Sequence, residues 1–423
     1  MPSAWLQNVT PASIVSAGQS ISTLGTAFTQ YAVPLLIFQV THSPLNLALA
    51  TATFALPNLL FGLFVGAWVD RVNRKRLMIA VNVLLALTLL VIPGLALVGR
   101  LNVLAIYAVD FAASTLAMVF QRAEFTAIPS LVGQRDLVTA NGRINASFQT
   151  MQMVGPTLAG AIATLVSVPA LLFFDAISYV LSAGALMWIG VPFNRRDEAP
   201  RARTTIRADI VEGIRYVFTH PVLRNISLLM MLFNFFESTF RAQQVLYAKE
   251  RLHTTNFELG LLFAMGGLGA VLFSLAAGAL RRRFAFSTVV IGCLAGTGLL
   301  TVAYASVAWL WLALPLLLLR EGSASLLNIN TFSLRQAIVP NQMLGRVLSV
   351  AGLLAFSATP VGSLVGGYLI QQTQDVGLVF QGIGVLLFLI PMAFSLTALG
   401  RADRYLPPEA RARARTASGV DPR

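Results

Sequence analysis

The residues best suited to chemistry are a few charged side chains inside long apolar stretches, because a charge there is costly and usually has a function. Glu237 and Arg241 are four residues apart and share one helix face, and Arg320 and Glu321 are neighbours in a second stretch. Asp110 lies in a third. We expect the acids to exchange protons, with Glu237 and Glu321 as the leading pair. The alternative is that both pairs are permanently ionised bridges that hold helices together.

Three further charges in apolar surroundings have other expected roles. Arg122 and Glu124 lie so close to the end of their stretch that contacts with a loop or gate are expected. Asp175 is expected to be structural. Its expected partners are the polar side chains of the preceding stretch, Asn145, Gln149 and Gln152.

A dense group of charges separates the second and third apolar stretches, within GLFVGAWVDRVNRKR at 62–76. Gly66 allows a neighbouring helix to approach closely, and Asp70 places an anion at a helix end. Asn73 occupies a tight reversal, where we expect a positive φ. Four cations follow Asp70 within six residues: Arg71, Arg74, Lys75 and Arg76. The group is either an inner gate or a charged loop that anchors two helix ends.

Composition places the chain in a membrane. It is 56% hydrophobic and 11% charged, with a mean hydropathy of +0.74, whereas soluble domains carry about 25% charge. Residues 1–69 contain no Asp, Glu, Lys or Arg, and a secretory signal needs a basic start, so we expect the first spans to be retained. The net charge of +13 follows from cations at membrane surfaces, and no nucleic-acid partner is expected.

Several classes of site are not expected. The single Cys293 allows no disulfide framework, and the three histidines lie far apart, so no metal site is predicted. The sequence has no nucleotide-binding motif and no nucleophile–base set, so we expect neither an enzyme nor a cofactor.

Twelve apolar stretches are long enough to span a bilayer, which predicts an all-α membrane protein. They cover roughly 12–40, 44–69, 77–99, 103–128, 144–166, 168–192, 225–248, 257–280, 284–307, 309–337, 347–372 and 376–400. With the N-terminus inside, the outer loops hold only Arg100, Lys249 and Arg251 among the cations. Both termini are therefore predicted to be cytoplasmic.

The long connection 193–224 divides the chain into two six-helix bundles, 1–192 and 225–400, followed by a basic tail, 401–423. Within the connection, Ile210, Ile214, Val217 and Phe218 share one helix face, so an amphipathic helix is expected to end before Pro221. The halves also repeat, because Gly66 and Pro129 recur as Gly278 and Pro340 at nearly the same offset.

The charged loop resembles the G-x-x-x-D-R/K-x-G-R/K-R/K motif that follows the second helix of major facilitator superfamily transporters, with Asn73 in place of the second glycine. A branch of that superfamily, the bacterial exporters that include the enterobactin exporter and macrolide efflux pumps, is similar over almost the whole chain. The similar stretches are LGTAFTQYAVPLLIFQVTHSP, FTAIPSLVGQRDLVTANGRINA, VGPTLAG, EGIRYVFTHPVLRN and QAIVPNQMLGRVLSV.

The resemblance implies the major facilitator fold and a central cavity lined by spans 1, 4, 7 and 10. It assigns Gly155, Pro156 and Gly160 to the antiporter motif of span 5, with Ala159 in place of one glycine; close helix packing is the alternative. Thr26 stands where such exporters commonly have an acid. The aromatic and amide side chains expected in the cavity are Gln30, Tyr31, Phe236, Phe240, Asn328 and Asn330.

The function that these features favour is proton-coupled efflux of a small amphipathic molecule such as a drug, siderophore or secondary metabolite. The expected partners are this molecule, the bilayer and protons, and the protein is expected to be a monomer. Uptake or lipid flipping by the same fold is the alternative. A receptor or scaffold would not need charges in its cavity-lining helices.

Overall fold

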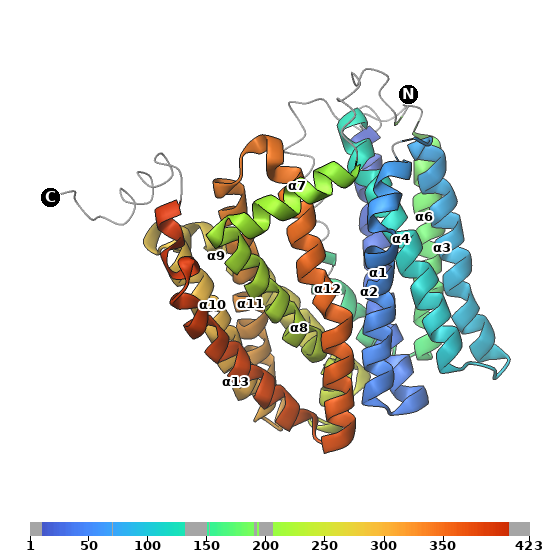
Figure 1. Ribbon diagram of the computed structural model, residues 1–423. Coiled ribbons are helices and arrows are strands. Elements are labelled where there is room, and N and C mark those ends of the chain that lie inside the picture. Colours follow the sequence, from blue (N-terminus) through green and yellow to red (C-terminus); the bar gives the residue numbers. More distant parts are fainter. Residues whose placement is uncertain are drawn as a thin grey trace, which may run out of the picture. The chain divides into compact units, whose positions relative to one another are not determined.

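A computed structural model of the chain describes residues 11–69, 71–131, 150–151, 153–189, 193 and 206–405. Within these ranges every regular element is a helix (Figure 1). This follows from the long apolar runs, because a helix satisfies its backbone hydrogen bonds internally and can therefore cross lipid. The chain divides into two compact units, each described separately below.

Unit 1 comprises residues 1–201 and 254–264. Within it α6 packs against α1 and α3, and α4 packs against α2 and α3. Its elements are α1 (Pro11–Thr41), α2 (Pro44–Val69), α3 (Arg74–Leu97), α4 (Val103–Leu131), the short η2 (Val168–Ala170), α6 (Leu171–Trp188), the helical segment Met153–Ile162 and the first turns of α9 (Asn256–Arg283).

Unit 2 comprises residues 202–253 and 265–423. Within it α8 packs against α12, and α10 packs against α11 and α13. Its elements are α7 (Ile206–Thr219), α8 (Pro221–Glu250), the remainder of α9, α10 (Phe286–Ala305), α11 (Leu310–Ile338), α12 (Asn341–Thr373), α13 (Val376–Ser395) and η3 (Ala398–Tyr405).

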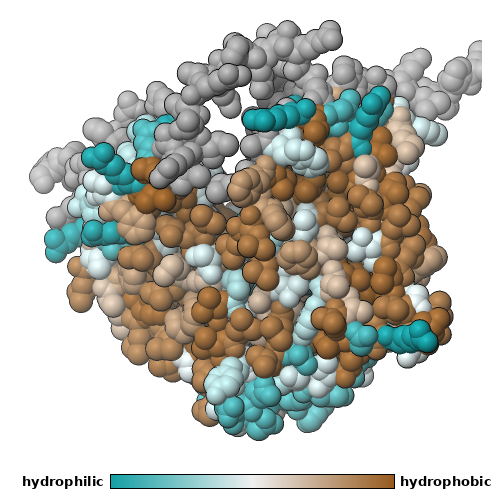
Figure 2. All heavy atoms as spheres, turned by 45° about the vertical axis from the view of Figure 1, so that its right-hand side comes forward, coloured by the Kyte–Doolittle hydropathy of each residue, from teal (hydrophilic) through white to brown (hydrophobic). Residues whose placement is uncertain are grey.

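Ten of the described helices are long and apolar enough to cross a membrane, or eleven if the bent pair α7–α8 forms one span. Met153–Ile162 is a shorter apolar helix. In the view of Figure 2, hydrophobic side chains cover most of the visible described surface, and the hydrophilic ones gather mainly toward its upper and lower parts. The chain is a multi-pass membrane protein.

Two helices begin earlier than predicted, α8 at Pro221 and α12 directly after Pro340. The prediction included only the uncharged part of each helix.

The amphipathic helix predicted before Pro221 is present as α7, and the chain bends by 100° between it and α8. Its apolar side chains divide between two environments. Val217 is buried in a cluster with Val347 and Val350 of α12, whereas Ile214 and Phe218 are exposed. The predicted single apolar face is therefore partly a protein contact and partly a surface.

The reversal between α2 and α3 corrects one prediction. Asn73 has φ −70° and ψ 104°, an extended conformation and not the expected positive φ. Its side chain accepts a hydrogen bond from the backbone nitrogen of Arg76 at 3.0 Å. Asn73 is thus the N-cap of α3, a position that Asn favours because its oxygen satisfies an unpaired backbone N–H.

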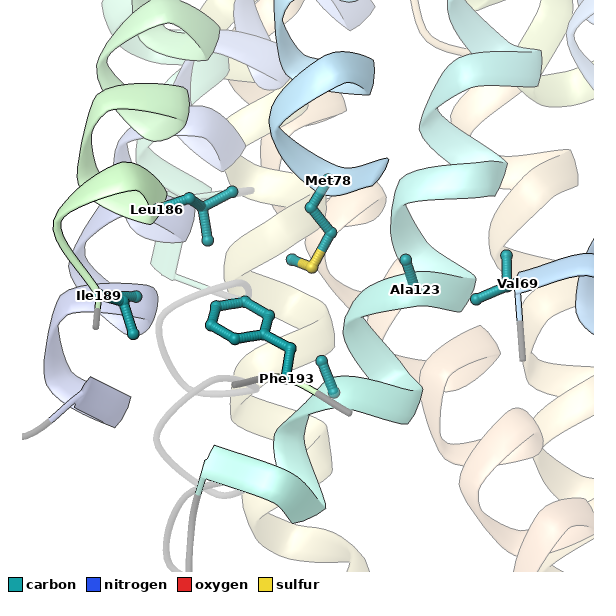
Figure 3. Packing of buried hydrophobic residues seen from close by; sticks show 7 residues of the cluster. Val69, Met78, Ala123, Leu186, Ile189 and Phe193 are labelled. Carbon is teal, nitrogen blue, oxygen red and sulfur yellow. The ribbon is translucent and has the colours of Figure 1, made fainter. Parts of the chain in front are cut away.

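Near this reversal, a small apolar cluster joins the ends of four helices (Figure 3). Val69 of α2 and Met78 of α3 are buried together with Ala123 of α4 and Leu186 of α6. Phe193, which follows α6, completes the cluster with its ring fully buried. This packing fixes the positions of the helix ends that carry the charged loop.

Candidate functional site

Unit 2 brings four of the predicted charges into one cluster, formed by α8 and α11. Glu237 and Arg241 lie one turn apart on α8, with Arg241 Nε 3.0 Å from Glu237 Oε1. Arg320 of α11 places Nη2 2.5 Å from Glu237 Oε2 and Nη1 3.3 Å from Glu237 Oε1. Glu321 pairs with Arg320 and receives Arg241 Nη2 at 3.3 Å. The negative charges of the two carboxylates and the positive charges of the two guanidinium groups therefore cancel.

Arg320 is the fixed centre of this cluster. Its side chain is 0% exposed, and its Nε donates to Thr301 Oγ1 of α10 at 3.0 Å. Its guanidinium lies 3.4 Å from the centre of the Phe240 ring, a cation–π contact. The Phe240 ring in turn packs against Tyr304 and Phe380. The guanidinium is therefore held at its edges by Glu237, Glu321 and Thr301 and on one face by an aromatic ring.

The opposite edge of the cluster is open. The Arg241 side chain is 62% exposed and that of Glu321 is 16% exposed, compared with 5% for Glu237. An incoming polar group can reach Arg241 without opening the core. If Arg241 turns toward such a group, Glu321 loses one of its two cationic partners, whereas Glu237 keeps both of its bonds to Arg320. The geometry thus makes Glu321 the carboxylate whose charge is most easily disturbed.

The fifth predicted charge lies elsewhere. Asp110 is half-buried on α4 in unit 1, whereas the four-residue cluster belongs to unit 2. Arg122 is exposed on the same helix, and Glu124 is buried there.

The charged loop of unit 1 uses two of its cations to close helix ends. Lys75 Nζ lies 2.6 Å from the carbonyl oxygen of Ile189 and 3.3 Å from that of Met187, at the C-terminal end of α6. Arg74 Nη1 donates to the carbonyl of Thr126 in the last turns of α4 at 3.3 Å. Cations are favourable there because the last carbonyls of a helix are unpaired and carry a partial negative charge.

A cavity of about 540 Å³ lies beside these contacts. Its polar lining is basic, with Arg71 and Arg76 exposed, and its apolar lining includes Ile79 and Phe193. Gly66 lies within α2, and Asp70 lies outside the described residues.

The span 5 motif makes two close backbone contacts inside unit 1. A Cβ on Gly155 would collide with Cβ of Ala27 on α1. A Cβ on Gly160 would lie 2.7 Å from the carbonyl oxygen of Asn256 and 3.0 Å from Cα of Gly260, both on α9. These contacts support the packing interpretation of the motif, because only glycine lets the helices come so close. Pro156 lies between them, inside the helix.

The six residues expected in the cavity have different surroundings. Gln30 and Asn328 are exposed, and Phe236 is half-buried. Tyr31 is buried and donates from its hydroxyl to the carbonyl of Asn256 at 2.6 Å. Phe240 and Asn330 are also buried, Phe240 beneath Arg320 as described and Asn330 with its amide donating to the carbonyl of Leu326. Gln30, Phe236 and Asn328 are thus the three that are not buried, although the Asn328 amide donates to the carbonyl of Ala324 at 3.0 Å.

Sequence reasoning missed two features. Thr301, which accepts from Arg320, is one small polar residue in an apolar helix and has no distinguishing signal. Asp175 bonds across to Thr29 of α1, a partner not foreseen, whereas the predicted partners at positions 145, 149 and 152 lie outside the described residues. Among the described residues no group of three His, Cys, Asp or Glu is placed to hold a metal ion.

Comparison with known proteins gives agreeing results. The profile of the transmembrane secretion effector family matches residues 4–418. The multidrug efflux pump Tap of Mycolicibacterium fortuitum is 28% identical over 81% of this chain and 85% of its own. The enterobactin exporter EntS of Salmonella typhi is 24% identical over 89% of this chain and 90% of its own. Among solved structures, the nucleoside transporter NupG superposes with a TM-score of 0.76 at 12% identity, covering 92% of this chain and 100% of its own, which shows the fold.

Proposed function

Because this chain belongs to the transmembrane secretion effector family of the major facilitator superfamily, we propose that it is a proton-coupled exporter of a small amphipathic molecule that works by alternating access. The family and the relatives are transporters and not enzymes. Export is the favoured direction because the sequence relatives over most of the chain include an efflux pump and an exporter.

The observation that carries the coupling proposal is the asymmetry of the charge cluster. Arg320 and Glu237 form its fixed part, whereas Arg241 and Glu321 form its open edge. When Arg241 turns toward a polar group of the substrate, Glu321 can pair with a cationic group of the same molecule, and a proton taken up by Glu321 ends that pairing. The arrival of a proton and the departure of the substrate are then linked, because both compete for the same carboxylate.

The transport proposal includes the twelve-span architecture. Ten apolar helices, α8 and the apolar segment Met153–Ile162 together give twelve spans, in bundles 1–192 and 225–400. The connection 193–224 and the tail 401–423 lie on the cytoplasmic side with both termini, in the inner membrane of a bacterium. The transporting unit is a monomer.

The charged loop is proposed as the inner gate, with Asp70 as its anion. A helix-end anion beside several cations can stabilise one state of a two-state transporter and be released in the other. We expect Asp70→Asn to reduce turnover while folding and ligand binding remain intact. Normal transport by this variant would mean that the loop only anchors the two helix ends.

The decisive experiment measures substrate and proton movement together in liposomes. The compounds are a cationic dye as a general probe of multidrug efflux, a macrolide and enterobactin, because the relatives are named a multidrug efflux pump, a macrolide efflux protein and an enterobactin exporter. Glu321→Gln is expected to remove proton movement with substrate. Glu237→Gln is expected to impair this proton movement indirectly, because the variant weakens the bond to Arg320. Glu258→Gln is the control, because Glu258 is a half-buried residue outside the cluster that accepts from the backbone nitrogen of Thr255 at the start of α9.

If both variants in the cluster move protons and substrate at the wild-type ratio, the cluster is structural and the coupling proposal is wrong.

The alternative function, uptake, is tested in the same liposomes with the proton gradient reversed. It has a specific basis, since the fold is shared with a nucleoside transporter. Accumulation of substrate on the side that loses protons supports export, and accumulation on the side that gains them supports uptake.

A further inference from the structure

Unit 1 contains a carboxylate, Asp175, that the proposed coupling mechanism does not use. Asp175 is only 1% exposed and lies at the interface of α6 with α1. Thr29 Oγ1 donates to Oδ2 at 2.5 Å, and Ser178 Oγ lies 3.1 Å from Oδ1. Hydroxyl groups can either donate to a carboxylate or accept from a carboxylic acid. These partners therefore suit both protonation states.

No cation approaches Asp175 from the described elements around it. α6 packs against α1, α3 and η2, and neither α1 nor η2 contains a charged residue. The cations of α3 are confined to residues 74–76, which meet the other end of α6. Ile189, the contact of Lys75, follows Asp175 by about four helical turns, or roughly 20 Å along the axis.

The other titratable groups on these elements are tyrosines. Tyr179 lies one turn after Asp175, but its hydroxyl pairs with Thr26 at 2.9 Å. Tyr31 of α1 donates to the carbonyl of Asn256. Among the described residues Asp175 therefore has hydrogen bonds from hydroxyls and no compensating charge, unlike Glu237 in unit 2.

The helices are too close at this point to leave room for water around the carboxylate. A Cβ added to Gly25 of α1 would lie 2.9 Å from Cα of Asp175 and would also collide with Oδ1 and with Ser178 Oγ. An ionised carboxylate without a cation or a hydration shell is costly in such surroundings. The packing of α1 on α6 thus favours the neutral acid.

A stripe of hydroxyl groups leads away from this position along the same interface. Ser22, Thr26 and Thr29 recur on one face of α1, and Thr26 Oγ1 bonds both the carbonyl of Ser22 and Tyr179. On α6 the stripe continues to Ser182, whose hydroxyl accepts from Asn82 of α3 at 3.0 Å. Small hydroxyl residues are typical of close helix interfaces in membranes, and each hydroxyl can donate or accept a hydrogen bond.

We propose that Asp175 is a proton-binding site within unit 1. The carboxyl group holds its proton while α1 and α6 are packed together. When water reaches the carboxyl group, its O–H bond breaks and the proton passes to water. This site is independent of the cluster around Arg320, and its test does not require transport.

The test is infrared difference spectroscopy on the purified full-length protein in liposomes at neutral pH. We expect a carbonyl band of a protonated carboxylic acid in the wild type and its loss in Asp175→Asn. Asp375→Asn is the matched control, because Asp375 caps α13 through Leu378 at an exposed position; it should keep the band. The spectrum of the wild type minus that of Asp175→Asn should contain this band, and its absence from that difference would overturn the proposal.

A second variant keeps the proposal testable if Asp175→Asn does not fold. Thr29→Val preserves the carboxyl group and removes its shortest hydrogen bond. The carbonyl band of the neutral acid should then shift to higher frequency, as expected for a less hydrogen-bonded carbonyl. An unshifted band assigns the signal to another residue and contradicts the proposal.

Discussion

Lys75 Nζ lies 2.6 Å from the carbonyl oxygen of Ile189, so a cation of the charged loop closes the C-terminal end of α6. Arg74 reaches α4 by donating to the carbonyl of Thr126, between one and two turns before the end of that helix. The loop therefore holds three helices of unit 1 at one end, α3, α4 and α6, whatever part it plays in gating. A change in its charges should affect stability as well as turnover, and the two effects have to be measured separately.

Lys75→Met tests the capping contact, because methionine keeps the apolar stem and removes the charge. We expect the free energy of unfolding to fall by about 1 to 2 kcal/mol, the range for a cation at a partly buried helix end. Thermal unfolding of the purified protein in detergent measures the loss. Arg76→Met is the control, since Arg76 is exposed and its change should shift the unfolding free energy by less than about 0.5 kcal/mol. Equal effects of the two variants would contradict the capping role.

Arg320→Met should be strongly destabilising, because it leaves Glu237 buried without its main partner. Removing one member of a buried pair typically costs about 3–5 kcal/mol. We expect Glu237→Gln in the same chain to recover much of this loss, since the uncompensated charge is then gone. Arg241→Met should cost less than about 1 kcal/mol, because that side chain is largely exposed. Failure of the double variant to recover stability would show that the aromatic contacts of Arg320 dominate.

Gly160→Ala tests the close contact between the span 5 segment and α9. The new Cβ would lie 2.7 Å from the carbonyl oxygen of Asn256, so the helices must shift. Overpacking of this kind costs about 1–3 kcal/mol. Gly184→Ala on α6 is the matched control, because nothing lies within 4 Å of its Cβ position and alanine is the better helix former. A Gly160→Ala protein as stable as the Gly184→Ala protein would rule out this contact as the reason for the glycine.

Much of the helical structure could be predicted from the sequence, because apolar length and proline positions act locally. The start of α7 and the one-turn spacing of Glu237 and Arg241 follow from helix periodicity. The charges of α11 were also found, since a charge in an apolar run is conspicuous.

Contacts between helices could not be predicted in the same way. The bond from Arg320 to Glu237 depends on how α8 and α11 approach each other, which no spacing encodes. The partner of Asp175 is Thr29, more than a hundred residues away, and a threonine in an apolar helix carries no signal. The grouping of residues 254–264 with unit 1 likewise depends on packing and not on chain order.

The proposed topology makes a prediction about the two ends of α13. Asp375 caps the start of this helix, which is long and apolar enough to cross the membrane once, and the basic tail follows η3. Cysteines placed at Asp375 and Arg415 should therefore react with an impermeant maleimide from opposite sides, position 375 from outside and position 415 only after the membrane is opened. The background is Cys293→Ser, which removes the native thiol. Loss of the Asp375 cap costs about 1 kcal/mol, too little to invert a span. Labelling of both positions from the same side would mean that α13 does not cross the membrane. Labelling of position 415 from outside and 375 from inside would reverse the proposed orientation.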